Sequence, residues 1–200
     1  MTQQGKIDFL KQRFLEAAFV KDAEKGYVVV EPFNLAIDPD ILQFASRSWA
    51  QEFHAHKQIN AIVGLPDAGA RLVSILAEML RVERILPAKR AQLIPGAWQD
   101  VVSYTNKSFT TETVGVQSHI GFVKSGDSVL LVDDVIAYGD TAVAAIKSLQ
   151  ESGVDVLGMC VLFDKVWQGG VERIEKETGI KPYSLIRIQE ITKEGKIKLQ

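Results

Sequence analysis

The chain has 200 residues, of which 46% are hydrophobic, so it can bury one substantial core and we expect a single domain over residues 1–200. Its formal net charge of −2 argues against the broad basic surface of a nucleic-acid-binding protein. The single cysteine, Cys160, excludes a disulfide framework within the chain, and no apolar stretch reaches the length of a membrane span. These features predict a cytoplasmic protein.

The first ninety residues indicate alternating helices and strands. Asp38 is a good N-cap for a helix that would begin at Pro39, and a run of β-branched residues closed by Pro32 is typical of a short strand. In chain order we expect a helix, a strand, a second helix, a strand–loop–helix unit and another strand, at residues 5–20, 26–32, from Asp38, 59–80 and 83–88.

Residues 91–110 form a long excursion that mixes Pro, Gly, Ser, Thr and Asn with a few aromatic side chains. Long excursions in compact domains are often functional, so we expect a mobile loop here. A further strand is predicted over residues 114–121.

The second half of the chain continues the alternation, which indicates an α/β domain with a mainly parallel sheet. Ligands bind such sheets at the carboxyl ends of the strands, so the loops within residues 64–70 and 132–142 are the candidate site. The expected strands are 129–136, 154–164 and 182–188, the expected helices 142–153 and 171–179, and the expected terminal hairpin 190–200.

Two adjacent carboxylates, Asp133 and Asp134, end an apolar strand, although like charges in contact repel and resist burial. The loop at residues 137–141 (Ala-Tyr-Gly-Asp-Thr) precedes a helix, whose N-terminal N–H groups and dipole favour an anion. Carboxylates beside such a site accept hydrogen bonds from sugar hydroxyls, so the pattern indicates a 5-phosphorylated ribose. A nucleotide P-loop and a dinucleotide fingerprint are disfavoured, because their Gly-Lys-Ser/Thr ending and spaced glycines are absent.

This stretch resembles the phosphoribosyl-diphosphate (PRPP) signature of type I phosphoribosyltransferases: an apolar strand, two acids and a loop usually written Thr-Gly-Gly-Thr. The chain departs from it with Tyr138 at the first Thr and Asp140 at the second Gly. The resemblance covers nearly the whole chain and is greatest to the xanthine branch, through FNLAIDP, AKR, DKVWQGG, SLIRIQ and an EGK hairpin. It implies a single-domain α/β fold, a mainly parallel sheet flanked by helices, a small hood built from both terminal segments, and 91–110 as the mobile loop.

The resemblance also implies how PRPP would be held. Asp133 and Asp134 would be the catalytic acids and face the ribose hydroxyls, directly or through the Mg²⁺-bound diphosphate. Mg²⁺ would be held mainly by the substrate rather than by direct protein ligands. The 5-phosphate would be bound by Ala137, Tyr138, Gly139, Asp140 and Thr141. The diphosphate would be bound by Asp67, Ala68, Gly69, Lys89 and Arg90.

Two further expectations concern the diphosphate. Family members often have a non-proline cis peptide in the diphosphate loop, and by position we expect it between Asp67 and Ala68. When the mobile loop closes, Tyr104, Lys107 and Ser108 could also reach the diphosphate.

The purine base would be met by Asn34, Lys165 and Trp167. Trp167 offers a flat face for stacking, and the Lys165 ammonium offers a donor to an oxygen at C6. Asn34 resembles the ring-reading Asn of the xanthine enzymes. Lys165 favours a 6-oxopurine such as xanthine, but the segment QLIPGAW (92–98) resembles the Leu-Pro-Gly of adenine enzymes, so adenine is an alternative.

The predicted function is therefore a purine phosphoribosyltransferase of purine salvage, a homodimer that uses PRPP and Mg²⁺ to make a nucleoside 5′-monophosphate and diphosphate. A PRPP-sensing regulatory domain without catalysis is the alternative of a different class. Orotate or uracil chemistry is disfavoured by the purine-like Lys165-Val166-Trp167. We expect no nucleic-acid partner and no membrane association.

Overall fold

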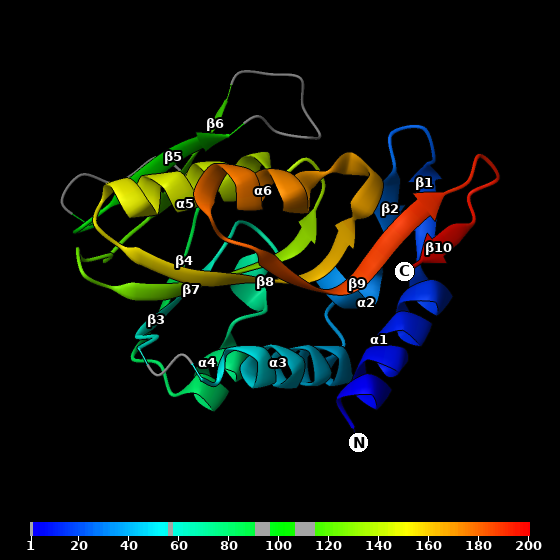
Figure 1. Ribbon diagram of the computed structural model, residues 1–200, viewed down its shortest axis with the longest axis horizontal. Helices are drawn as coiled ribbons and strands as arrows, with labels where there is room; N and C mark the ends of the chain where they lie inside the picture. Colours follow the sequence, from blue (N-terminus) through cyan, green and yellow to red (C-terminus); the bar gives the residue numbers. More distant parts are fainter. Residues whose placement is uncertain (1, 56–57, 91–96, 107–114) are drawn as a thin grey trace.

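The computed structural model describes residues 2–55, 58–90, 97–106 and 115–200. Its centre is a six-stranded sheet in the order β10-β9-β8-β7-β3-β4, in which β10 is antiparallel to β9 and the other neighbours are parallel (Figure 1). This confirms the predicted α/β domain. The strands of the sheet are β3 (Ala61–Gly64), β4 (Arg84–Pro87), β7 (Ser128–Ile136), β8 (Asp155–Lys165), β9 (Pro182–Ile191) and β10 (Ile197–Leu199).

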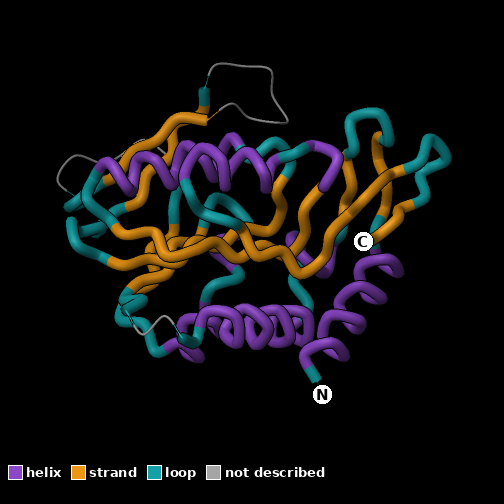
Figure 2. Tube along the Cα trace, viewed as in Figure 1, coloured by secondary structure: helices purple, strands orange, loops and turns teal. Residues whose placement is uncertain are grey.

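Helices cover both faces of this sheet (Figures 1 and 2). Helices α1 (Gln3–Ala17), α3 (Pro39–Phe53) and α4 (Ser74–Leu80) lie on one face, and α5 (Asp140–Glu151) and α6 (Gly170–Thr178) lie on the other. Asp38 caps α3 as predicted, because its side chain accepts a hydrogen bond from the Asp40 N–H at 2.8 Å.

Successive residues of the central strands serve the two faces in turn, so each face has its own apolar cluster. In β7, Leu130 and Val132 belong to the cluster under α3 and α4, whereas Val129 and Leu131 belong to the cluster under α5. The central strands are therefore buried on both sides, which explains their continuous apolar runs in the sequence.

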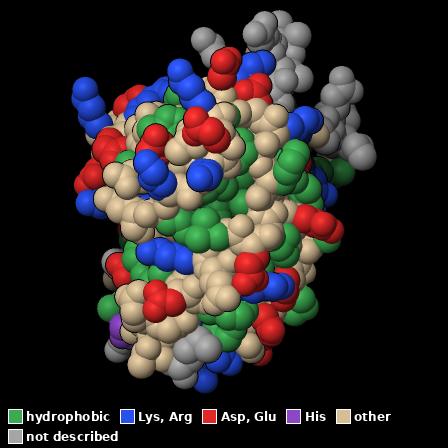
Figure 3. All heavy atoms as spheres, turned by 90° about the vertical axis from the view of Figure 1, so that its right-hand side faces the viewer, with side chains coloured by type: hydrophobic (Ala, Val, Ile, Leu, Met, Phe, Trp, Pro, Cys, Tyr) green, Lys and Arg blue, Asp and Glu red, His purple; other side chains and the backbone are tan. Residues whose placement is uncertain are grey.

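A small second layer, the hood, stands at one end of the sheet. It contains β1 (Phe19–Asp22), β2 (Tyr27–Val29) and the short α2 (Glu31–Asn34), with β10 beside them (Figure 1). The expected strand over 26–32 is thus wrong in its second half: Pro32 lies in the first turn of α2, where its missing N–H costs nothing. Seen from this end, apolar side chains gather in the middle of the surface between groups of charged ones (Figure 3).

The segment after β4 differs most from its prediction. Residues 102–106 form β5 (Val102–Asn106), which pairs antiparallel with β6 (Val116–Ile120), so this part of the expected loop is a strand. Tyr104 is 3% exposed and packs into the cluster next to α5, which explains why a strand forms in a polar stretch. Residues 91–96 and 107–114, including Lys107, Ser108 and most of QLIPGAW, lie outside the described part.

Candidate functional site

A cavity of about 440 Å³ opens at the carboxyl ends of the parallel strands β3, β7 and β8. The hood contributes to its wall through Tyr27, Val28, Asn34 and Leu35. The position agrees with the general rule for α/β sheets. The predicted site residues that line it are Asn34, Asp67, Ala68, Arg90, Asp133, Asp134, Ala137, Tyr138, Gly139, Asp140, Thr141 and Lys165.

The two acids at the end of β7 have different surroundings. Asp133 is 8% exposed, and its Oδ1 accepts a hydrogen bond from the Asp134 N–H at 2.9 Å. Burial, together with the negative charge of Asp134, raises the pKa of Asp133 well above the usual carboxyl value. Asp134 Oδ2 accepts a hydrogen bond from Asn34 Nδ2 at 2.7 Å. The hood is thereby joined directly to the acid pair.

The loop 137–141 leads from β7 into α5 and lines the cavity along its whole length. Gly139 is the N-cap of α5 with φ of 80°, a left-handed conformation that favours glycine, and its carbonyl accepts the Val143 N–H at 2.9 Å. The start of α5 at this wall presents backbone N–H groups, which is an arrangement that can bind an anion.

The loop after β3 forms the opposite wall. A cis peptide joins Pro66 to Asp67, which corrects the expected position between Asp67 and Ala68 by one residue. Arg90 Nη1 donates to Asp67 Oδ2 at 3.0 Å, so the two charged groups of this wall lie together. Gly69 lies behind the lining, where an added Cβ would collide with the carbonyl oxygen of Val132. Its small size lets this loop pack directly against the end of β7.

Lys89 lies outside the lining residues. Its backbone pairs with His119, and its ammonium nitrogen lies 5.4 Å from the centre of the Trp98 ring. Tyr104, another candidate for the diphosphate, is buried in the cluster beside α5. The structure thus brings Arg90, but not these two side chains, to the cavity.

Lys165 ends β8 and is 5% exposed at the cavity wall. Burial lowers its pKa to about 8, and the neighbouring Asp134 carboxylate opposes this effect. A buried amine that is mostly protonated near neutral pH can offer a directed hydrogen bond to a ligand acceptor.

Trp167 lies beyond the cavity lining. It is 43% exposed, and its ring packs against the β1–β2 turn, where a Cβ added to Gly26 would meet Trp167 Cζ2 at 2.8 Å. Tyr27, the first residue of β2, lines the cavity instead. Nothing in the sequence singles out Tyr27, because its position depends on how the hairpin folds over the sheet.

Arg71 is a second lining residue that the sequence did not single out. Its Nη1 donates to the Leu35 carbonyl oxygen at 3.1 Å and so links the loop after β3 to the hood. The complete wall therefore has cationic groups at Arg71, Arg90 and Lys165 around the acid pair.

This donor set suits a ligand that carries phosphates and sugar hydroxyls. Backbone N–H groups and guanidinium groups bind phosphate oxygens, and carboxylates accept from hydroxyl groups. Within the described residues, no cluster of three or more His, Cys, Asp or Glu side chains could hold a metal by itself. A Mg²⁺ ion would fit beside the acids when substrate phosphates supply most of its oxygen ligands.

A family model described as "Phosphoribosyl transferase domain" matches residues 38–189 of the chain. The chain is 24% identical to the hypoxanthine/guanine phosphoribosyltransferase of Methanobacterium lacus (strain AL-21) over 195 residues, covering 96% of this chain and 95% of that one. It is 34% identical to the adenine phosphoribosyltransferase of Maricaulis maris (66% and 72% covered) and 29% identical to the xanthine phosphoribosyltransferase of Listeria innocua (86% and 91% covered).

Solved structures with the same fold include two adenine phosphoribosyltransferases. The protein from Rhodothermus marinus has a TM-score of 0.72 at 21% identity, with 92% of this chain and 99% of that chain covered. The protein from Trypanosoma brucei, in complex with AMP, pyrophosphate and ribose-5-phosphate, has a TM-score of 0.74 at 16% identity, with 93% and 82% covered. At these identities the likeness establishes the fold. None of the described helices combines the length and the apolarity needed to cross a bilayer.

Proposed function

The chain belongs to the phosphoribosyltransferase family, in its purine-using branch, which confirms the predicted resemblance; from this premise we propose that it transfers the phosphoribosyl group of PRPP to a 6-oxopurine, with xanthine as the first choice. The reaction breaks the bond between ribose C1 and diphosphate and forms one between C1 and a ring nitrogen, which loses its proton. The products are a nucleoside 5′-monophosphate and diphosphate.

One observation carries this proposal: the acid pair, the loop 137–141 and Lys165 line the same cavity. In the proposed complex, the loop binds the 5-phosphate and Asp133 and Asp134 face the ribose hydroxyls. Positive charge develops on ribose in the transition state, and fixed carboxylates favour that charge. The raised pKa of Asp133 shows that its negative charge is poorly compensated in the protein alone, so a positive charge on the ribose would be favourable beside it.

The diphosphate lies, in this proposal, along the loop at Asp67 and Ala68 with Arg90 beside it. Arg90 already contacts Asp67 at 3.0 Å, so diphosphate would compete for a guanidinium that is held in place. Gly69 lets this loop pack onto β7. Binding of the diphosphate by Lys89 remains a prediction, and it requires the ammonium group to move away from the Trp98 ring. Mg²⁺ bound to the substrate would neutralise charge on the departing diphosphate.

The base lies between the hood and Lys165. The Lys165 ammonium would donate to the oxygen at C6, whereas the amino group of adenine would present a second donor. Asn34 donates to Asp134, and its Oδ1 is buried without a hydrogen-bond partner in the described structure, so that atom is suited to accept from a ring N–H. Trp167 remains a predicted stacking residue, but Tyr27 is the aromatic side chain in the cavity wall.

A base panel tests the proposal. Purified protein with PRPP and Mg²⁺ is given xanthine, guanine, hypoxanthine, adenine, uracil and orotate, and diphosphate and nucleotide are both measured. We expect turnover with the 6-oxopurines and a lower kcat/KM with adenine. A preference for adenine would overturn the 6-oxopurine assignment, and PRPP binding without diphosphate release for any base would favour a sensor.

A further inference from the structure

The proposed phosphate loop contains a side chain of the wrong charge. Asp140 lines the cavity as the first residue of α5, next to the backbone that would hold the 5-phosphate. A carboxylate this close to a phosphate repels it, and the loops that this segment resembles have glycine here. Some feature of this chain must therefore offset the charge.

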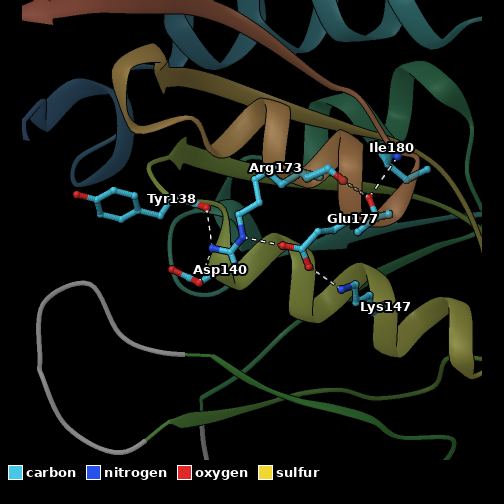
Figure 4. A network of polar contacts seen from close by, with 8 residues as sticks. Tyr138, Asp140, Lys147, Arg173, Glu177 and Ile180 are labelled. Carbon is cyan, nitrogen blue, oxygen red and sulfur yellow. Dashed lines mark hydrogen bonds and ion pairs between the residues drawn. The ribbon is translucent and has the colours of Figure 1, made fainter.

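Arg173 in α6 contacts this loop at two points (Figure 4). Its Nη1 donates to Asp140 Oδ1 at 2.8 Å and to the carbonyl oxygen of Tyr138 at 3.1 Å. The ring of Tyr138 points away from these contacts. The Arg173 guanidinium therefore pairs with the Asp140 carboxylate and also binds the backbone of the loop.

The backbone contact fixes the direction of a donor. In a trans peptide the C=O of one residue and the N–H of the next point in opposite directions. Because the Tyr138 carbonyl is directed at Arg173, the Gly139 N–H is directed away from it. The orientation of that N–H, which belongs to the cavity wall, depends on a side chain outside the loop.

Arg173 is itself held from the side opposite the loop. Its Nε donates to Glu177 Oε1 at 2.8 Å, and Glu177 Oε2 accepts from Lys147 Nζ of α5 at 2.6 Å (Figure 4). These two cations lower the pKa of Glu177 to about 2, so Glu177 is charged at neutral pH. Asp140, Arg173, Glu177 and Lys147 form a neutral set that joins the loop to both helices.

Close packing joins the same parts. A Cβ added to Gly139 would lie 3.0 Å from the Gly170 carbonyl oxygen, and one added to Gly170 would collide with the Ala137 carbonyl. The loop therefore rests on the first turn of α6, and movement of that helix would move the loop.

We propose that Arg173 is a positioning residue for the 5-phosphate of PRPP: it neutralises Asp140 and fixes the 138–139 peptide so that the loop can accept an anion. The inference rests on the proposed function of the loop. It assigns no contact between Arg173 and the substrate, and it predicts that the need for Arg173 is created by Asp140.

A double-mutant cycle tests this coupling. Arg173→Met keeps the apolar stem and removes the charge, leaving Asp140 unpaired. We expect the KM for PRPP to rise about five- to twentyfold, as is typical for one member of a charged network, while kcat and the KM for the base change less than about twofold. Asp140→Asn in the Arg173→Met background removes the repulsion and should return most of the PRPP affinity.

Arg13→Met is the matched control, because it breaks an ion pair of the same kind, with Asp38 at 2.9 Å, away from the loop. It should leave the kinetic constants unchanged, and thermal melts show whether each variant is folded. An unchanged KM for PRPP in folded Arg173→Met would overturn the proposal. So would failure of Asp140→Asn to restore affinity, because Arg173 would then act on the phosphate itself or on the fold alone.

The outcome is separable from that of the proposed function. If the wild-type protein turns over no base, calorimetric titration with PRPP on the same variants still measures the coupling. The inference then predicts the same weakening in Arg173→Met and the same recovery in the double variant. A cycle without coupling refutes the inference even where the wild-type protein is an active enzyme.

Discussion

The two sides of the cavity are built in different ways. The side proposed for PRPP comes from residues at or just after the ends of two parallel strands: 66–68 after β3 and 133–141 at the end of β7. The side proposed for the base combines Tyr27 and Asn34 of the hood with Lys165 at the end of β8. The first is a local motif, whereas the second depends on segments that are far apart in the chain.

This difference explains why family membership and base preference are not equally evident. A local motif keeps its geometry when the rest of the chain varies, because one strand, one turn and one helix start determine it. A wall assembled from distant segments changes with every shift of the hood. Relatives with adenine, xanthine and hypoxanthine/guanine in their names are accordingly all similar to this chain.

The largest effect is expected on the local side. Replacing both Asp133 and Asp134 by Asn removes the charges proposed to face ribose, and kcat/KM should fall roughly 10³-fold, since each lost transition-state contact is worth about 2–4 kcal/mol. Burial of Asp133 means that Asn keeps the shape and removes an unfavourable charge, so the fold should survive. Steady-state kinetics and a thermal melt check this, and near-normal activity in the folded variant would contradict the assignment.

The backbone of loop 137–141 gives the next largest effect. Gly139→Val forces a β-branched side chain into φ of 80° and toward the Gly170 carbonyl and Ile174. PRPP binding should weaken about 100-fold, since strain of about 1–3 kcal/mol adds to lost phosphate contacts. Calorimetry with PRPP and with free base measures the two separately. Equal weakening of both would mean that the loop does not bind the phosphate.

A substitution at Lys165 tests the side of the cavity proposed for the base. Lys165→Met keeps the stem and removes the donor, so kcat/KM with a 6-oxopurine should fall about tenfold or more, because an unpaired buried acceptor costs about 1–3 kcal/mol. The rate with adenine should fall less, which narrows the difference between the two bases. If the ratio of the two kcat/KM values is the same in wild type and variant, Lys165 does not read the group at C6.

The sequence predicts the features that depend on neighbouring residues better than those that depend on segments far apart in the chain. Continuous apolar runs predicted β7 and β8, and Asp38 predicted the start of α3, because these depend on near neighbours. Asp133, Asp134 and 137–141 were predicted together for the same reason. The sequence did not predict the roles of three other residues, because each depends on segments distant in the chain. Tyr27 lines a cavity built from several segments, Arg71 donates to the Leu35 carbonyl oxygen, and Arg173 pairs with Asp140. Strand β5 was missed because its polar residues pair with β6 and bury Tyr104.

The lowered pKa of Lys165 predicts a pH effect. With a pKa of about 8 the ammonium donor is mostly present near pH 7 and mostly lost near pH 9. Binding of a 6-oxopurine should therefore weaken about tenfold from about pH 7 to about pH 9, in proportion to the protonated fraction. The profile is compared with that of Lys165→Met, which removes the contribution from titration of the base itself. If wild type and Lys165→Met have the same pH profile of binding, protonation of the Lys165 amine does not affect binding of the base.

The smallest effect distinguishes the two aromatic residues that could stack on the base. Tyr27 lines the cavity, whereas Trp167 packs behind it on the turn at Gly26. Tyr27→Ala should raise the KM of every purine about fivefold, because stacking is worth about 0.5–1.5 kcal/mol and does not depend on the group at C6. Trp167→Ala acts only through the position of the hairpin and should change the same constants about twofold. Both are measured with xanthine and adenine at saturating PRPP, with kcat as the internal control. A larger effect for Trp167 than for Tyr27 would mean that the hairpin shifts when the base binds and that the Trp167 ring then stacks on it, as the sequence resemblance implies.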